Sequence, residues 1–123
     1  MSAKMIVDTS SILFALSNRM DAFRAIEEAD EDYEPVVTSG VVTELKDIGK
    51  GRGKQSMNAR AALSVMKERS IEVIAAGGVV DDSILSAAKR FRCSVCTNDI
   101  GLKRRLKASG VKAVSIGRDR KLR

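Results

Sequence analysis

Short apolar runs alternate along the chain with longer segments whose apolar residues recur every three or four positions. The short runs are rich in β-branched residues, a pattern that is typical of buried strands. They lie at positions 4–7, 35–38, 71–74, 94–97 and 112–116. The longer segments have the spacing of helices that bury one face. They lie at positions 12–16, 20–29, 41–48, 57–69, 81–91 and 99–108.

Strands that are almost continuously apolar and that alternate with helices predict a parallel sheet covered on both faces. We therefore expect an α/β fold: a single three-layer domain with a central parallel sheet of about five strands and helices on both faces. No internal repeat and no linker divides the chain. In such a sheet, ligands bind at the carboxyl ends of the strands, at the point where the strand order reverses.

Acidic residues recur at the points where the predicted strands end. Asp8 directly follows the first strand, and Asp99 follows the fourth. Glu44 lies on the inner side of the helix after the second strand, and Asp81 and Asp82 begin the helix after the third. Each acid taken alone is explained as a helix cap, because aspartate and other carboxylates are stabilising near helix N-termini.

Taken together, these acids indicate a metal site. The carboxyl ends of parallel strands share one edge of the sheet, so acids from four distant segments are expected to converge in one cleft. Carboxylates that lie within ~4–6 Å of one another raise one another's pKa, and they destabilise the fold unless a positive charge lies between them. Oxygen ligands of this kind suit Mg²⁺ or Mn²⁺, and we expect one of these as the cofactor.

Composition excludes several kinds of site. The 123-residue chain contains no histidine, which removes histidine bases and histidine-ligated zinc, and its two cysteines cannot supply four soft ligands. Aromatic residues make up 3% of the chain, which argues against a base-stacking platform. No apolar run approaches the ~20 residues of a membrane span, and no signal peptide precedes the first strand, so we expect a cytoplasmic protein without membrane contact.

The charge distribution favours a polyanionic partner. The formal net charge is +6, and the bases gather in the glycine-rich segment at 49–54 and on the helix at 99–108. A solvated basic surface is the alternative interpretation. The residues that we expect to contact the phosphates of RNA are Lys50, Arg52, Lys54, Lys103, Arg104, Arg105 and Lys107.

Four segments that contain these acids resemble the signature segments of the PIN-domain family, in the order that the family has them. They are Asp8-Thr9-Ser10, Val42-Thr43-Glu44-Leu45, Asp81-Asp82-Ser83-Ile84 with Ala87-Ala88, and Thr97-Asn98-Asp99. The resemblance covers the chain from about Met5 to Ile116, and it implies a nuclease domain over residues 1–117 followed by a basic tail at 118–123.

The family resemblance implies a metal-dependent endoribonuclease. The acids that match its catalytic quartet, and hence its metal ligands, are Asp8, Glu44, Asp81 and Asp99, with Asp82 left as the alternative to its neighbour. The residues that match its polar supports are Ser10, Thr97 and Asn98. We expect one ion at Asp8 and Asp99, with Glu44 and Asp81 holding a second ion or ordered waters. A water activated by the metal would attack the scissile phosphorus in line.

The helix that contains Glu44 leads into a glycine-rich basic loop, and this order resembles the branch of the family that processes ribosomal RNA. Two alternatives stay open: a VapC-type toxin ribonuclease, which would be paired with an acidic antitoxin, and a catalytically silent scaffold that binds RNA. The helix faces that carry Ile12, Phe14, Phe23 and Ile26 are expected to be exposed and compatible with a homodimer.

Overall fold

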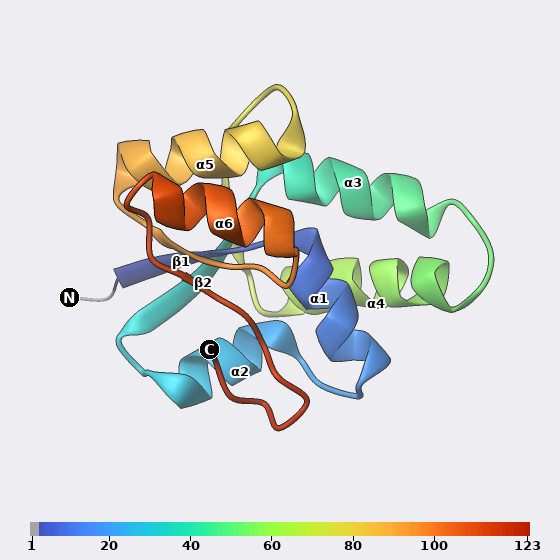
Figure 1. Ribbon diagram of the computed structural model, residues 1–123. Helices are drawn as coiled ribbons and strands as arrows, with labels where there is room; N and C mark the ends of the chain where they lie inside the picture. Colours follow the sequence, from blue (N-terminus) through green and yellow to red (C-terminus); the bar gives the residue numbers. More distant parts are fainter. Residues whose placement is uncertain (1–2) are drawn as a thin grey trace.

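The computed structural model describes residues 3–123, which form one α/β domain (Figure 1). Its strands and helices alternate as the apolar pattern predicts. The strands are β1 (Ala3–Val7), β2 (Tyr33–Thr38), β3 (Glu72–Ile74), β4 (Ser94–Cys96) and β5 (Ala113–Val114). The helices are α1 (Thr9–Ser17), α2 (Ala22–Ala29), α3 (Ser39–Gly49), α4 (Lys54–Glu68), α5 (Val80–Phe91) and α6 (Ile100–Ala108).

The five strands form one parallel sheet in the order β3-β2-β1-β4-β5, which confirms the predicted architecture. Beginning at β1, the chain adds β2 and β3 on one side and then crosses to add β4 and β5 on the other. The strand order therefore reverses between β1 and β4, where Val7 is the partner of Cys96. A ligand site is expected beyond the carboxyl ends of these two strands.

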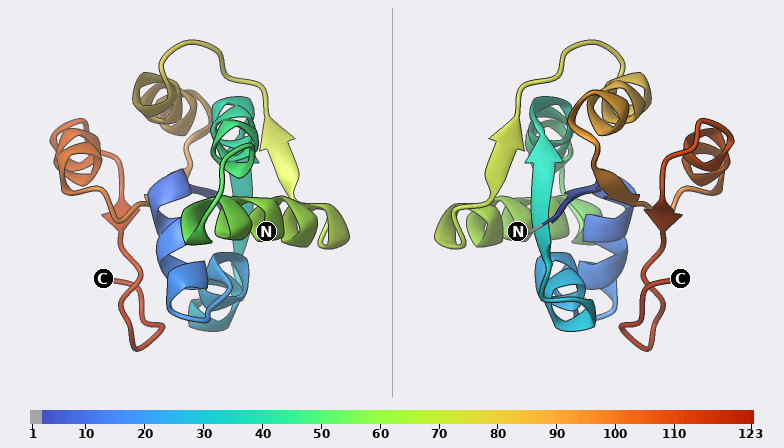
Figure 2. Two further views of the ribbon diagram at one scale, coloured as in Figure 1. Left: turned by 90° about the vertical axis from the view of Figure 1, so that its right-hand side faces the viewer. Right: turned by 90° about the vertical axis from the view of Figure 1, so that its left-hand side faces the viewer.

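Helices cover both faces of the sheet (Figures 1 and 2). Helices α5 and α6 lie on one face and α1, α2 and α4 on the other, as right-handed crossovers in opposite directions require. Helix α3 continues beyond the carboxyl end of β2 and packs against both α4 and α5. None of the helices in the described part of the chain is long and apolar enough to cross a membrane.

The apolar faces of α1 and α2 are buried in the core, so the expectation of an exposed dimer face there is wrong. At most 2% of the surface of Ile12, Phe23 and Ile26 is exposed, and Phe14 is half-buried against the same core. These residues lie where α1 and α2 pack against each other and α2 packs on β2. Their apolar character is therefore explained by the core of a single chain.

Side-chain caps fix the beginnings of three helices. Asp21 accepts hydrogen bonds from the backbone of α2, Thr38 from α3 and Asp99 from α6. Helix α5 differs from the prediction, because its N-cap is Val79 and both acids, Asp81 and Asp82, lie inside its first turn. There the two carboxylates are still favoured by the helix dipole, but they make no cap.

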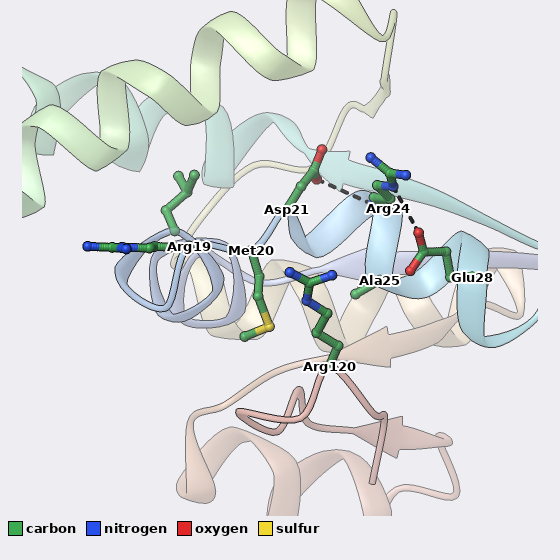
Figure 3. A pocket seen from close by; sticks show the side chains of 8 residues that line it. Arg19, Met20, Asp21, Arg24, Ala25, Glu28 and Arg120 are labelled. Carbon is green, nitrogen blue, oxygen red and sulfur yellow. Dashed lines mark hydrogen bonds and ion pairs between the residues drawn. The ribbon is translucent and has the colours of Figure 1, made fainter.

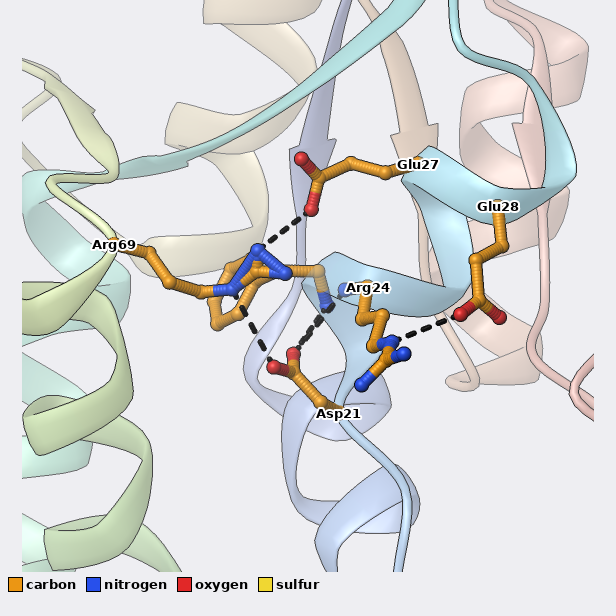
Figure 4. Close-up of polar contacts among 6 residues, drawn as sticks. Asp21, Arg24, Glu27, Glu28 and Arg69 are labelled. Carbon is orange, nitrogen blue, oxygen red and sulfur yellow. Dashed lines mark hydrogen bonds and ion pairs between the residues drawn. The ribbon is translucent and has the colours of Figure 1, made fainter.

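One half-buried arginine ties the end of α4 to α2 (Figure 4). Arg69, which follows α4, places its Nη1 2.7 Å from Glu27 and its Nε 3.4 Å from Asp21. The neighbouring pair of Arg24 and Glu28 lies on the exposed side of α2 (Figure 4). Asp21 and Glu27 therefore hold α2 to the end of α4.

The segment after β5 folds back on itself. Ile116 and Leu122 form an isolated antiparallel bridge, and the Arg123 amide donates to the Ser115 carbonyl at 2.8 Å. Lys103 of α6 donates to the Ser115 hydroxyl at 3.0 Å and to the Arg123 carbonyl at 3.3 Å. The basic residues at 118–123 therefore lie in a turn that is held to α6.

Candidate active site

Asp8 and the segment 97–99 meet at the point where the strand order reverses. The Asp8 amide donates to the Cys96 carbonyl at 2.9 Å, which extends the pairing of β1 and β4 by one residue. The two strands end together because their apolar residues pair in register. The residues that follow them are thereby brought to one place at the carboxyl edge of the sheet.

Two hydroxyl groups fix the carboxylate of Asp8, which is 4% exposed. Its Oδ2 atom accepts hydrogen bonds from Ser10 Oγ at 2.5 Å and from Thr97 Oγ1 at 2.8 Å. The Ser10 hydroxyl in turn accepts from the Asn98 amide at 3.0 Å. Within residues 3–123, Oδ1 takes no hydrogen bond and remains for a ligand.

Asp99 is oriented by the helix that it begins. Its Oδ1 accepts from the Leu102 amide at 2.9 Å, and its own amide donates to Thr97 Oγ1 at 3.1 Å. The hydroxyl of Thr97 thus contacts both Asp8 and Asp99. In the described part of the chain no hydrogen bond occupies Oδ2 of Asp99, which leaves each of these two acids with one free carboxylate oxygen.

Asp81 lies within electrostatic range of the other three acids. Burial raises the pKa of its carboxyl, and the negative charges of Asp8, Asp99 and Glu44 raise the pKa further, against the opposing charge of Arg105. The direction of this shift is consistent with carboxylates from α3, α5 and the ends of β1 and β4 lying within electrostatic range of one another.

Asp82 has a different environment from Asp81. Its carboxylate lies 2.7 Å from Nη2 of Arg105 on α6, and the pair is largely exposed. Successive positions on a helix point about 100° apart, so two adjacent acids cannot face the same cleft equally. The ion pair of Asp82 with Arg105 therefore favours Asp81 as the acid that belongs with Asp8, Asp99 and Glu44.

The donors present at this site are those that a hard divalent cation prefers. They are carboxylate oxygens, some of them free, and their mutual repulsion would be relieved by a cation. Within residues 3–123, however, no three acidic or cysteine side chains are already close enough to hold an ion together. A cation shared by these acids therefore requires their side chains to move closer, or waters to complete its coordination.

The Asn98 side chain forms hydrogen bonds that hold the backbone around the site. Its side chain accepts from the Ile116 amide at 3.0 Å, donates to the Ile116 carbonyl at 2.9 Å and accepts from Ser11 Oγ at 2.7 Å. Ser11 is fully buried and was not singled out by the sequence motifs. Ser11 lies one helical turn before Ala15, which is also fully buried, and this spacing is the signal that could have found it.

The predicted RNA-binding cations divide into two groups. Three of them have partners. Lys50 forms an ion pair with Asp47, and Arg105 forms one with Asp82. Lys103 donates hydrogen bonds to the Ser115 hydroxyl and the Arg123 carbonyl. The other four side chains are exposed and form no ion pair within residues 3–123. They are Arg52, Lys54, Arg104 and Lys107.

A separate pocket of about 410 Å³ lies between the end of α1, α2 and the C-terminal turn. Figure 3 shows Arg120 reaching from that turn toward Met20 and Ala25, with Asp21 at the N-cap of α2 and Arg24 and Glu28 on the helix. None of the acids or polar supports predicted from the sequence lines this pocket. It is therefore distinct from the carboxylate site.

Comparison with known proteins gives consistent results. The family model described as "PIN like domain" matches residues 5–120. Ribonuclease VapC9 of Archaeoglobus fulgidus is 28% identical over 118 residues, covering 95% of this chain and 85% of that protein. The structure of the PIN domain endonuclease Utp24 has a TM-score of 0.80 at 27% identity, over 98% of this chain and 89% of that one. A domain of a functionally unknown protein from Methanocaldococcus jannaschii shares the fold, with a TM-score of 0.67 at 23% identity and coverage of 94% and 92%.

Proposed function

The chain belongs to the PIN-like domain family, as its four motif segments indicated, and we propose that it is an endoribonuclease that depends on Mg²⁺ or Mn²⁺. The observation that supports this most is that Asp8 and Asp99 meet at the point where the strand order reverses, where the Thr97 hydroxyl contacts both. The raised pKa of Asp81, to which burial and the charges of Asp8, Asp99 and Glu44 contribute, supports adding the other two acids to the same site. A cation there would relieve a repulsion that the fold otherwise tolerates.

We propose Asp8, Glu44, Asp81 and Asp99 as the residues that hold the cation. A bound divalent ion would activate a water for attack on the phosphodiester and offset negative charge on the leaving oxygen. Ser10 and Thr97 hold Oδ2 of Asp8 and so leave Oδ1 available for the cation. The α6 amide of Leu102 fixes Asp99 in the same way, leaving its second oxygen available.

RNA is proposed as the substrate for two reasons. The relative from Archaeoglobus fulgidus is named a ribonuclease, and the present chain has a net charge of +6. The four exposed cations without ion pairs in the described part of the chain, on the 50–54 segment and on α6, are proposed to contact phosphates. Contacts of this kind position a nucleic acid without reading its sequence.

The test is cleavage of RNA by the purified chain with Mn²⁺. We expect Asp8→Asn and Asp99→Asn to lose cleavage while they remain folded, because each removes a negative ligand and keeps the shape of the side chain. Glu68→Gln, which neutralises an exposed acid on α4, is the matched control and should cleave like the wild type. Cleavage by both asparagine variants at the wild-type rate would refute the assignment.

For the cellular substrate we propose ribosomal RNA, supported by the likeness to Utp24 over 98% of this chain and by the basic loop after α3. The similarity to Ribonuclease VapC9 favours a second candidate, a toxin ribonuclease with an acidic antitoxin. Depletion of the chain from its own cells should let unprocessed ribosomal RNA accumulate. Growth arrest on expression of the wild type but not of Asp8→Asn, reversed by a co-encoded acidic protein, would instead establish the toxin.

A further inference from the structure

A hollow of about 410 Å³ lies beside Glu44, between α3 and the segment 75–79 that precedes α5. Much of its wall is small or apolar, with Gly77, Gly78, Ile48 and Val80 among the residues that line it. Thr43 and Asp47 add polar groups from the face of α3. The hollow therefore combines an apolar interior with polar atoms on one side.

The wall of this hollow is held in place by the fold. Ser39, at the start of α3, donates to the Ala76 carbonyl at 3.1 Å and accepts from the Ala76 amide at 3.0 Å. These two bonds fasten the segment 75–79 to the helix opposite it. The space is consequently formed before any ligand arrives, which lowers the entropic cost of binding.

The hollow adjoins the carboxylate site on two sides. Glu44 belongs to its wall and to the four interacting acids, and Val80 directly precedes Asp81. A group that occupies the hollow would therefore lie beside Glu44, one of the proposed cation ligands. Under the proposed nuclease function, such a group belongs to the RNA.

The chemistry of the lining distinguishes a base from a phosphate. Glu44 and Asp47 line the hollow, and neither lysine nor arginine does. Asp47 is paired with Lys50 at 3.2 Å, so the carboxylate that would repel a phosphate is Glu44, which has no ion pair in the described part of the chain. A nucleobase has flat faces that suit glycine and aliphatic walls, and its amino groups donate to carboxylate oxygens. We propose that the hollow binds one nucleobase of the RNA beside the bond that is cut, an inference that rests on the proposed nuclease function.

The experiment compares a cleaved RNA with copies in which one nucleotide at a time is abasic. For the wild type we expect about tenfold slower cleavage when one position next to the cut bond lacks its base, since a polar contact to the edge of a base contributes on that order. Positions further away should show no such dependence. Equal cleavage rates for every abasic RNA would overturn the proposal.

Variants that fill the hollow test its location. A Cβ atom at Gly77 meets nothing within 4 Å, so Gly77→Leu is tolerated, and Thr43→Trp enters from the exposed face of α3. Both should cleave complete RNA about as slowly as the wild type cleaves the sensitive abasic RNA, and should no longer respond to the missing base. Ala75→Leu, exposed on the same segment but outside the hollow, is the control.

Measurements of RNA affinity distinguish a failure of the base site from a failure of the nuclease proposal. Affinities for the complete and the sensitive abasic RNA are measured by fluorescence anisotropy without a divalent ion, where no cleavage occurs. A weaker affinity for the abasic RNA in the wild type, absent in Gly77→Leu, supports the hollow as a base site even if Asp8→Asn still cleaves. Equal affinities of the wild type for the two RNAs would refute the base site and leave the nuclease proposal standing.

Discussion

The hydroxyl of Thr97 donates a 2.8 Å hydrogen bond to Oδ2 of Asp8, which lies 89 positions earlier in the sequence. Thr97 is fully buried, so water cannot replace this bond. The bond forms because β1 and β4 are neighbours in the sheet and end at the same level. The hydrogen bond therefore connects the order of the strands to the orientation of an acid in the proposed metal site.

Replacing Thr97 by valine should weaken both the fold and the site. Valine has nearly the same shape but no hydroxyl, so Asp8 and the Asp99 amide each lose a partner. We expect a loss of about 1.5–3 kcal/mol in the free energy of unfolding, measured in urea, because a buried carboxylate loses a bond. Cleavage should slow by about tenfold or more, as for other partners of metal ligands. Thr97→Ser keeps the hydroxyl and should retain both properties.

The raised pKa of Asp81 predicts that its negative charge destabilises the folded chain. The carboxyl binds its proton more tightly when folded, so its stabilising contribution is complete below the ordinary pKa of 3.8 and is lost as the pH rises through the higher folded value. With EDTA present, Asp81→Asn should therefore melt a few degrees above the wild type at pH 7. The difference should disappear below pH 3.8.

The adjacent acid provides the control for this prediction. Asp82→Asn breaks the 2.7 Å ion pair with Arg105 and relieves no crowding of acids. It should leave the melting temperature unchanged or slightly lower at neutral pH, because exposed ion pairs contribute little. A rise equal to that of Asp81→Asn would mean that neutralising any acid on α5 is enough, and the proposed crowding around Asp81 would be wrong.

Much of the fold follows from the spacing of apolar residues, and the remainder depends on partners that are distant in sequence. Asp8 and Asp99 could be placed at one edge because each follows an apolar strand. Whether Asp81 or Asp82 faces that edge could not be decided, since this depends on α5 beginning at Val80 and on Arg105 lying opposite.

Two further features could not be predicted from the sequence, because they also depend on partners that are distant in the chain. In the sequence, the apolar faces of α1 and α2 are equally compatible with an interface and with the core. Only the packing of Phe23 and Ile26 in the structure shows that these faces belong to the core. Ser11 occurs in no motif, although its hydrogen bond to Asn98 supports the segment that contains Asp99. Periodicity identifies which face of a helix is buried, but it does not identify what covers that face.

Arg69 should contribute more to stability than the nearby Arg24. Arg69 is 29% exposed and holds two acids of α2, whereas Arg24 is 73% exposed and forms one pair within its own helix. Arg69→Ala is expected to lower the free energy of unfolding by about 1 kcal/mol, near the upper value for exposed pairs, because the site is partly desolvated. Arg24→Ala should cost about 0.3–0.5 kcal/mol. Urea unfolding of both variants checks the order, which a larger loss for Arg24→Ala would contradict.

Removing Arg104 and Lys107 together should reduce the salt dependence of RNA binding. Each phosphate contact to single-stranded RNA contributes about 0.7 to the slope of log affinity against log salt, so the double alanine variant should lower the slope by about 1.4. The control removes the same charge elsewhere, at Lys67 and Lys89, which are exposed on α4 and α5. An equal change of slope in the control would show that total charge, and not the basic face of α6, governs binding.

A divalent cation should stabilise the wild type through the four interacting acids. Ligand binding to the folded state contributes RT ln(1 + [L]/Kd), about 2.7 kcal/mol at a hundredfold excess over Kd, so the melting temperature should rise as Mn²⁺ is added. The rise should be smaller in Asp8→Asn and in Asp81→Asn, because each variant loses a charge that the ion would neutralise. In Asp82→Asn it should equal that of the wild type, since Arg105 already neutralises this acid. Equal shifts in all four proteins would place the bound Mn²⁺ outside the site, and the metal assignment would fail.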